Sequence, residues 1–527
     1  DDAKFVLLQN ELVNHAENLF VFVLHPEVEA TNNRSERQAR AEAMARKAAR
    51  TSKTDGEVTV NGRRIAYTAI AGTLILHNHM GQSTGSMFYV AYLKHGARAS
   101  RRPLTFIFNG GPGSSSVWLH MGAFGPMRVV TADHRHTPAA PYKLVKNQYS
   151  LLNASDLVFV DAMGTGFSRI IGKGKPKQFY SIDGDAQAFA QFVTSFLSKY
   201  GRWNSPKYLF GESYGTTRSA VLANVLERQD SVDLNGVILL SAILNFDTGS
   251  DGAHSNPGVN LPYFLALPTY AATAWYHKVL PQQPAKLQPF LREVEAFASG
   301  PYAQALAAGA ALSPSQEKAI AEQLHNYTGI SAAYWIRARL RVSGSQFEHQ
   351  LLLPEGDTTG RLDSRFVGPT FDPLAEGSEY DPQSTAISPA YTAAFNNYVR
   401  KDLKFGMGHS YRIMSMQVNR HWKFVHTPLG AGRSSWRGTP NVLPDLAAAM
   451  TADPDLKVML NGGYFDLATP FYAAIYQMRQ LPMARRLQKN IEYAFYPSGH
   501  MVYVHVPSLK ELHARVTAFI RSTDNLH

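Results

Sequence analysis

Short runs of apolar residues without polar alternation recur along the chain and predict strands that are buried on both faces. The runs occupy residues 104–109, 156–161, 207–210, 236–241 and 456–461. Helical stretches such as 185–201 and 217–229 separate several of them, as expected for parallel strands joined by crossovers. Residues 57–76 and 85–94 instead alternate, which predicts antiparallel strands at one edge. The pattern therefore predicts a doubly wound, mostly parallel α/β fold.

Two regions outside these runs have a different sequence pattern. Residues 1–53 are irregular and then charged and Ala-rich, so we expect an N-terminal extension. Between residues 246 and 404 the parallel-strand runs stop, and Ala-rich helical stretches take their place. We expect 246–404 to be a helical cap inserted over the carboxyl edge of the sheet. The α/β core would then consist of 54–245 and 405–527.

The composition of the chain argues against several classes of partner and of chemistry. No stretch approaches the run of ~18 apolar residues that a membrane-spanning helix needs, so no span is expected. The formal charge is +11, but Lys and Arg are scattered and RNA-binding aromatic signatures are missing, so we expect no nucleic acid partner. The chain has no cysteine, which excludes disulfides, thiol catalysis and cysteine–zinc sites.

The stretch GESYG at 211–215 fits Gly-x-Ser-x-Gly at the junction between an apolar strand and an amphipathic helix. Such a tight turn forces the serine into a strained backbone conformation, and flanking glycines let neighbouring chain pass close by. The hydroxyl of Ser213 would project from the sheet edge, with the next amide N–H at a helix N-terminus. A chance pentapeptide in a turn is the alternative, but the strand–turn–helix context favours a nucleophile.

A serine at its ordinary pKa needs a base that is itself oriented by an acid, and in this context the chain order is Ser, acid, His. Asp466 follows a predicted strand, and His500 lies in a Gly-rich loop after the next one, 34 residues later (500 − 466). His505 is the nearest rival base, but His500 is preferred because Gly499 precedes it at a strand end. Asp161 also ends a strand, but it precedes the serine and has the wrong order.

A tetrahedral intermediate needs N–H donors that are fixed in advance. The sequence NGGPG at 109–113 follows an apolar strand, and its glycines permit backbone amides to approach a ligand closely. We expect the amide N–H groups of Gly111 and Tyr214 to be the oxyanion pair. A tight loop without a ligand is the alternative.

Taken together, these motifs resemble the serine carboxypeptidases, α/β-hydrolases that remove C-terminal residues, typically at acidic pH. The resemblance covers about 57–245 and 405–527. It rests above all on the pairing of the NGGPG loop with the GESYG elbow. The other matching motifs are FGP (124–126), DLVFVDAMGTGFSR (156–169), NGGYFDLATP (461–470) and SGHMV (498–502).

The resemblance implies the α/β-hydrolase fold, with Ser213, Asp466 and His500 as the catalytic triad. It implies Gly111 and Tyr214 as the oxyanion hole. The missing cysteines suggest a bacterial-type member of the family, peptidase family S10.

In this family the glutamate before the serine, here Glu212, works with the loop asparagine, here Asn109, to bind the terminal carboxylate of the substrate. A carboxylate facing a carboxylate is repulsive, so Glu212 has to be protonated in order to donate a hydrogen bond. The chain departs from the family at Ile107, where tryptophan is usual, and at Ala123, where a supporting glutamate is common. The expected clamp is therefore reduced to Asn109 and Glu212.

The leading hypothesis is a serine-type carboxypeptidase that hydrolyses peptides through an acyl-enzyme and is favoured at acidic pH. An esterase or acyltransferase with the same triad is the second hypothesis, and a catalytically silent binding protein the third. We expect peptide substrates and no cofactor or metal, since His77 and His79 lack an evident third ligand. Family habit suggests a secreted or periplasmic protein whose signal peptide has been removed. Side-chain preference and oligomeric state stay open, with a homodimer among the options.

Overall fold

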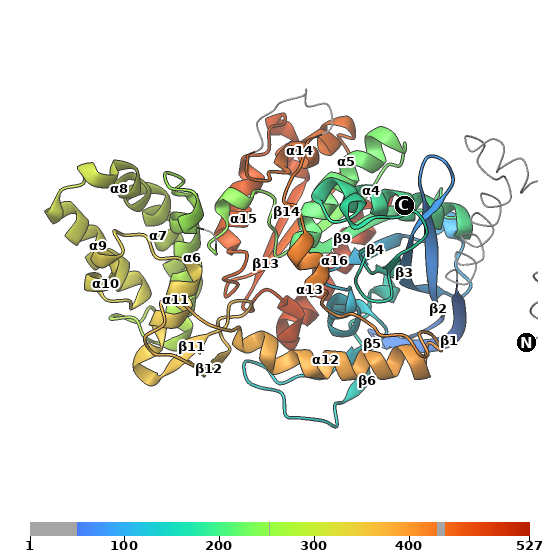
Figure 1. Cartoon of the computed structure of the whole chain (residues 1–527), viewed down its shortest axis with the longest axis horizontal. Helices are drawn as coiled ribbons and strands as arrows, with labels where there is room; N and C mark the ends of the chain where they lie inside the picture. Colours follow the sequence, from blue (N-terminus) through green and yellow to red (C-terminus); the bar gives the residue numbers. More distant parts are fainter. Residues whose placement is uncertain (1–49, 252, 429–437, 527) are drawn as a thin grey trace, which may run out of the picture.

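One ten-stranded sheet forms the centre of the computed structural model, which describes residues 50–251, 253–428 and 438–526 (Figure 1). The strands are β1 (Thr51–Val60), β2 (Arg63–His77), β3 (Ser83–Lys94), β7 (Asp156–Val160), β4 (Leu104–Phe108), β9 (Lys207–Glu212), β10 (Gly236–Leu240), β13 (Lys457–Gly463) and β14 (Ile491–Tyr496), in spatial order, with β8 (Arg169–Ile170) on β3. Strands β1, β2, β3 and β7 pair antiparallel, and β7 through β14 pair parallel. The predicted mostly parallel sheet with an antiparallel edge is confirmed.

Parallel pairing brings distant parts of the chain to one edge of this sheet. Phe108 at the end of β4 is opposite Gly211 in β9, and β9, β10, β13 and β14 continue in parallel. Asn109, Ser213, Asp466 and His500 all come shortly after the carboxyl ends of these strands. Ligands of such sheets bind in the crevice outside the carboxyl ends, so this edge is the place to look for a site.

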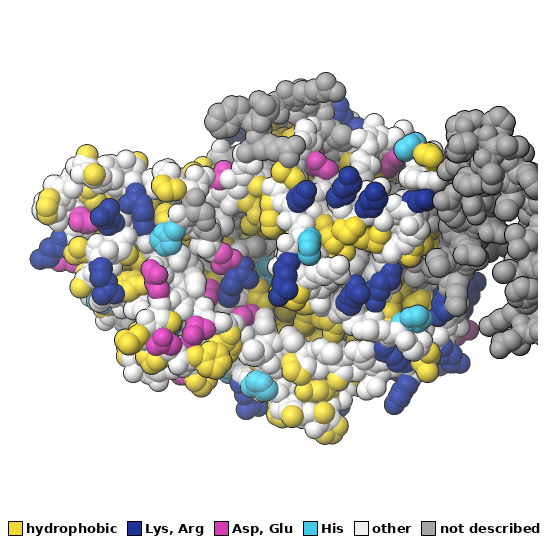
Figure 2. All heavy atoms as spheres, viewed as in Figure 1, with side chains coloured by type: hydrophobic (Ala, Val, Ile, Leu, Met, Phe, Trp, Pro, Cys, Tyr) yellow, Lys and Arg dark blue, Asp and Glu magenta, His cyan; other side chains and the backbone are white. Residues whose placement is uncertain are grey.

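The insertion forms a lobe beside the sheet, seen at the left of Figure 1. It contains α6 (Leu261–His277), α7 (Leu287–Phe297), α8 (Ala303–Ala308), α9 (Pro314–Thr328), α10 (Ala332–Arg337), α11 (Gly344–Leu351) and the small pair β11 (Asp357–Thr359) and β12 (Val367–Pro369). These helices bury an apolar cluster of their own. On the face shown in Figure 2, Asp and Glu are frequent on this lobe, whereas Lys and Arg are dispersed over the core. The positive charge thus forms no single patch on that face.

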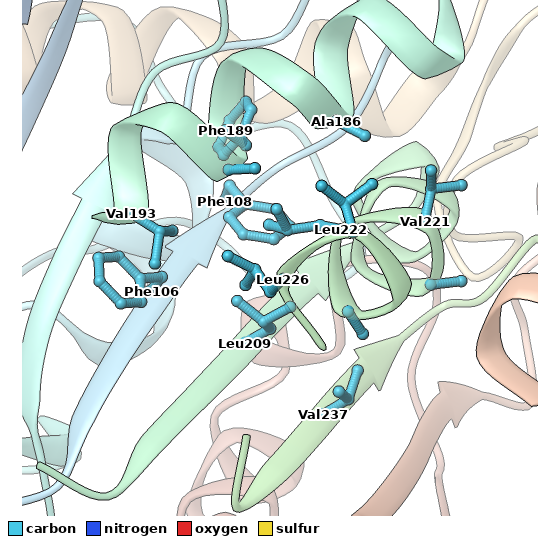
Figure 3. Packing of buried hydrophobic residues seen from close by; sticks show 14 of the residues in the cluster. Phe106, Phe108, Ala186, Phe189, Val193, Leu209, Val221, Leu222, Leu226 and Val237 are labelled. Carbon is cyan, nitrogen blue, oxygen red and sulfur yellow. The ribbon is translucent and has the colours of Figure 1, made fainter. Parts of the chain in front are cut away.

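Helices cover both faces of the sheet because successive strand residues point to opposite sides. Phe106 and Phe108 pack under α4 (Ile182–Tyr200) and α5 (Tyr214–Gln229), as Figure 3 shows, while Ile107 points to the other face. The first face is completed by α14 (Leu443–Ala452) and α15 (Phe471–Arg479). The second is covered by the π-helical turn η2 (Leu119–Phe124), α12 (Pro382–Lys401) and α16 (Val506–Thr523).

Two predicted boundaries differ in detail from the structure. Helix α12 falls within the predicted insertion 246–404, yet Ile387, Tyr391 and Phe395 belong to the apolar cluster on the sheet. Strand β1 begins at Thr51, so the end of the predicted extension lies in the sheet. The rest of that extension, up to residue 49, lies outside the described residues. The division into extension, core and insertion otherwise stays a prediction.

Shorter elements connect these layers. They are β5 (Met127–Val129), β6 (Leu144–Lys146), α13 (Met416–His421), η1 (Ala99–Arg101), η3 (Leu151–Asn153), η4 (Pro176–Gln178), η5 (Phe246–Thr248), η6 (Ala253–Ser255), η7 (Ala298–Tyr302), η8 (Gly309–Ala311), η9 (Leu353–Glu355), η10 (Arg485–Asn490) and η11 (Val502–Val504). In the part of the chain that the structure describes, no helix is both long and apolar enough to cross a membrane. Across those same residues, no group of three or more His, Asp or Glu side chains is arranged to hold a metal ion.

Candidate active site

Ser213 occupies a sharp turn between β9 and α5. Its backbone angles are φ 61° and ψ −131°, a region that L-residues other than glycine rarely adopt. A side chain at Gly211 would collide with the carbonyl of Gly215, and one at Gly215 would lie 2.9 Å from the carbonyl oxygen of Phe108. Both glycines are therefore required by close packing, and the turn leaves Ser213 at the edge of the sheet.

The glycine loop after β4 lies against this turn. A Cβ atom at Gly110 would collide with the amide nitrogen of Tyr214. The loop can therefore lie this close to the turn only because residue 110 is glycine. Gly111 follows with φ +105°. Within the described residues, neither the Gly111 nor the Tyr214 amide N–H donates a hydrogen bond to the backbone. The two predicted oxyanion donors thus come from adjoining segments and are available to a ligand.

A second strand-like segment fixes the far end of the glycine loop. The amide of Ser115 donates to the carbonyl of Ile413 at 2.9 Å, and the amide of Ser415 donates to the carbonyl of Gly113 at 2.8 Å. Sequence reasoning did not anticipate this contact, because residues 413–415 carry no motif that links them to the loop.

Asp466 and His500 form a buried pair. The Nδ1 atom of His500 lies 2.9 Å from Oδ2 of Asp466, and the other carboxylate oxygen accepts the amides of Ala468 and Thr469 at 3.0 and 2.9 Å. Burial by itself would lower the pKa of His500, but the charge and hydrogen bond of Asp466 outweigh it and raise that pKa. The Thr469 hydroxyl also donates to Asp466, at 2.7 Å. The acid is therefore fully hydrogen-bonded and orients the imidazole.

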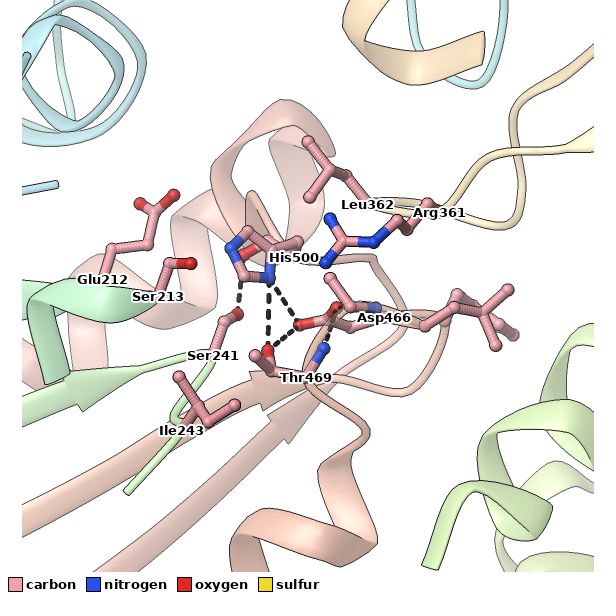
Figure 4. Close-up of polar contacts among 12 residues, drawn as sticks. Glu212, Ser213, Ser241, Ile243, Arg361, Leu362, Asp466, Thr469 and His500 are labelled. Atoms are coloured by element: carbon pink, nitrogen blue, oxygen red, sulfur yellow. Dashed lines mark hydrogen bonds and ion pairs between the residues drawn. The ribbon is translucent and has the colours of Figure 1, made fainter. Parts of the chain in front are cut away.

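The second ring nitrogen of His500 faces the side on which Ser213 lies (Figure 4). The described residues include no hydrogen bond between the Ser213 hydroxyl and His500. Catalytic hydrogen bonds are often long in unliganded enzymes and shorten when substrate binds. The structure thus gathers the three predicted triad residues at one edge, with the serine and the base on facing segments.

Glu212 points into the same site from the end of β9 and is buried. Burial raises its pKa to about 7, although the charge of His500 and hydrogen bonds from Tyr503 and Asn109 favour the ionised form. Its Oε1 atom accepts the Tyr503 hydroxyl at 3.2 Å, while Oε2 has no partner among the described residues. A buried oxygen without a partner suits a carboxyl group that donates to a ligand.

Tyr503 and Thr469 are the site residues that sequence reasoning missed. Tyr503 lies three residues after His500, and Thr469 three residues after Asp466, so the spacing along each loop could have pointed to both. The rejected rivals have other partners: His505 contacts the Ser508 hydroxyl at 2.7 Å, and Asp161 accepts the amide of Ser116 at 2.8 Å.

The sequence profile described as "Serine carboxypeptidase" matches residues 73–323. Serine carboxypeptidase-like 33 of Arabidopsis thaliana is 26% identical over 203 residues, which cover 38% of this chain and 38% of that protein. Pheromone-processing carboxypeptidase KEX1 of Yarrowia lipolytica is 30% identical over 145 residues, 27% of this chain and 22% of that protein. The matches therefore span less than two fifths of the length of either relative.

Among solved structures, proline iminopeptidase of Mycobacterium smegmatis is similar with a TM-score of 0.33 and 13% identity, covering 89% of this chain and 99% of that one. The strand order and the strand–serine–helix turn of the present chain are those of an α/β-hydrolase. The profile matched over residues 73–323 and the relatives named above show that this part of the chain is similar to the serine carboxypeptidases.

Proposed function

We propose that the protein is a serine-type carboxypeptidase that hydrolyses peptides at their C-terminus. The observation that carries the proposal is the combination, at one sheet edge, of the Asp466–His500 pair, Ser213 and a buried Glu212, one oxygen of which has no hydrogen-bond partner among the described residues. A general esterase needs the first three groups, but it has no use for a buried carboxyl group that faces its ligand.

In the proposed reaction, Ser213 attacks the last peptide carbonyl while His500 accepts its proton, and Asp466 stabilises the imidazolium. The amide N–H groups of Gly111 and Tyr214 would stabilise the oxyanion, because both donors are fixed before substrate arrives. His500 then returns the proton to the leaving amino group. In the second half of the reaction, His500 accepts a proton from water as the water attacks the acyl-enzyme, and it then returns that proton to Ser213.

The clamp for the substrate carboxylate would consist of Glu212, Asn109 and Tyr503. Because the pKa of Glu212 is raised to about 7, the group is neutral in mildly acidic solution and donates a hydrogen bond. Above that pH it ionises and repels the carboxylate. We therefore expect peptide binding to weaken as pH rises through about 7. An acidic compartment outside the cytosol would suit this behaviour, and secretion or a periplasmic location stays a prediction.

The test compares one blocked dipeptide as the free acid and as the C-terminal amide, from pH 5 to 8. Release from the acid alone, fading above about pH 7, would support the clamp. Equal cleavage of both forms, or action on esters only, would favour an esterase or acyltransferase. A Ser213→Ala variant should lose at least ~10³-fold in kcat with an unchanged melting temperature. Full activity in that variant would overturn the triad.

A further inference from the structure

A loop of the insertion, 361–364, packs directly on the loop that carries His500. The carbonyl of Leu362 accepts the backbone N–H of His500 at 2.6 Å. Gly499 has no room for a side chain, because an added Cβ would collide with the Cα and Cβ of Asp363. The glycine before the base is therefore required by contact with the insertion.

The same loop also contacts both neighbours of the catalytic acid. The backbone N–H of Leu467 donates to the carbonyl of Arg361 at 3.1 Å, and the N–H of Ser364 donates to the carbonyl of Phe465 at 3.0 Å. Phe465 and Leu467 flank Asp466 in sequence. One short segment of the insertion thus joins the acid loop to the base loop through three backbone hydrogen bonds.

Asp381 holds this loop in place. Its Oδ1 atom accepts the backbone N–H groups of Arg361 at 2.9 Å and Leu362 at 3.4 Å. Its Oδ2 atom accepts the N–H and the hydroxyl of Ser384 in the first turn of α12. Because α12 packs on the sheet, Asp381 connects the loop to the core rather than to the distal part of the lobe.

Arg361 also places a positive charge beside the base. Figure 4 shows its guanidinium directed toward His500, and its Nε atom lies 3.1 and 3.0 Å from the two carboxylate oxygens of Asp251. The charge of Arg361 lowers the pKa of His500, whereas Asp466 and Glu212 raise it. Three elements therefore present charge to the imidazole: the β9 turn, the loop after β13 and the insertion.

Other acidic groups near Arg361 belong to the insertion and α12. They are Glu348 and Asp381, and both favour the charged guanidinium when they are ionised. Burial raises the pKa of Glu348 to about 8, so this carboxyl group is neutral in acidic solution. Asp251 is thus the charged partner of Arg361 on the open side, where both side chains are about half exposed.

We propose that the insertion takes part in catalysis by positioning. The 361–364 loop holds the Asp466 and His500 loops together, and the Arg361–Asp251 pair adjusts the electrostatic potential at the His500 imidazole. The inference rests on the proposed function, in which His500 activates Ser213. Arg361 and Asp381 act here as positioning residues.

The charge is tested by the rate at which a fluorophosphonate labels Ser213 as a function of pH, which requires the base but no peptide clamp. Arg361→Met should raise the acidic midpoint of labelling and Asp251→Asn should lower it, each by roughly half a pH unit, because they remove opposite charges that solvent partly screens. Lys318→Met, on the exposed face of α9, should leave the midpoint unchanged.

Midpoints that move in the same direction, or that do not move, would overturn the inference while normal labelling leaves the proposed function standing. Failure of the unsubstituted protein to be labelled would overturn the proposed function and the inference with it. These two results are distinguishable, because the second appears before any variant is made.

The loop contact is tested by the kcat of two variants at Asp381. Asp381→Ala removes the acceptor and should lower kcat about 10-fold with KM unchanged, since the acid and base loops lose a common support. Asp381→Asn keeps an oxygen acceptor and should restore most of kcat. Ser384→Ala, which affects only the helix side of Asp381, serves as the control. An Asp381→Ala variant that is folded and retains full kcat would overturn the positioning role, as would an Asn variant no better than Ala.

Discussion

The two halves of the candidate site are held in different ways. Ser213 and the glycine loop meet inside the core, where Gly110 and Gly215 let two neighbouring strands end in close contact. Asp466 and His500 are joined to each other and are also spanned by the 361–364 loop, which belongs to the insertion. The nucleophile half is thus held by the sheet and by residues 413–415, whereas the acid–base half also depends on a segment of the insertion.

The largest loss of activity is expected when one methyl group is added to a tightly packed glycine in either half of the site. Gly110→Ala would push the glycine loop away from the Tyr214 amide, and Gly463→Ala would push the acid loop away from the carbonyls of Ser498 and Gly499. We expect each to lower kcat by ~10²–10³-fold and to lower the melting temperature. Gly300→Ala is the matched control, since nothing lies within 4 Å of its added Cβ.

The pH profile separates the two halves. Gly110→Ala should leave the acidic midpoint of fluorophosphonate labelling where it is, because the Asp466–His500 pair is untouched. Gly463→Ala should shift that midpoint downward, because separation from Asp466 removes the interaction that raises the pKa of His500. Identical profiles for the two variants would show that the halves are not independent.

A smaller effect is expected at the proposed carboxylate clamp, where Glu212 of the nucleophile half contacts Tyr503 from the loop after His500. In the unsubstituted protein, KM for a free-acid peptide should rise up to ~10-fold per pH unit above about 7, as Glu212 ionises. Glu212→Gln keeps an N–H donor at every pH, so its KM should stay level up to pH 8. An ester substrate without a carboxylate provides the control, and a KM for it that follows the same pH curve would contradict the clamp.

The same carboxyl group links stability to pH. Its pKa in the folded protein lies above the ordinary value of 4.5, so the folded state binds the proton more tightly than the unfolded state. The contribution of Glu212 to stability is therefore largest in acid and is lost as pH rises through about 7. Melting temperatures of the Glu212→Gln variant should depend less on pH over that window.

The smallest expected effect is at Tyr503. Tyr503→Phe removes the hydroxyl that donates to Glu212 at 3.2 Å, so KM for a free-acid peptide should rise by a few-fold. The pKa of Glu212 should rise slightly as well, since that hydrogen bond favours the ionised form. Tyr496→Phe removes a buried hydroxyl that donates to Asn461 and should leave KM unchanged. Equal KM values in the two variants would remove Tyr503 from the clamp.

Local sequence patterns predicted most of the sheet. The runs at 104–109, 156–161, 207–210 and 236–241 became β4, β7, β9 and β10, because an uninterrupted apolar strand is stable only where both faces are covered. The strand–GESYG–helix pattern also predicted the turn at Ser213, since its two glycines and its strained backbone are consequences of adjacent residues.

The features that could not be predicted from the sequence depend on contacts between segments that are distant in the chain. Helix α12 resembles the helices of the insertion in composition, and only its packing shows that it covers the sheet. Residues 413–415 have no motif, yet they pair with the glycine loop. Tyr503 joins the proposed clamp because the turn after His500 brings its hydroxyl to Glu212.

The sequence by itself determined the alternation of strands and helices and the chemistry of each loop, because both follow from neighbouring residues. The tertiary structure decided which loops meet. Gly499 illustrates the difference: its position before His500 is plain in the sequence, but the reason for glycine is close contact with Asp363, which lies 136 residues earlier (499 − 363). Such a contact depends on how the insertion folds back onto the sheet, and no local pattern encodes it.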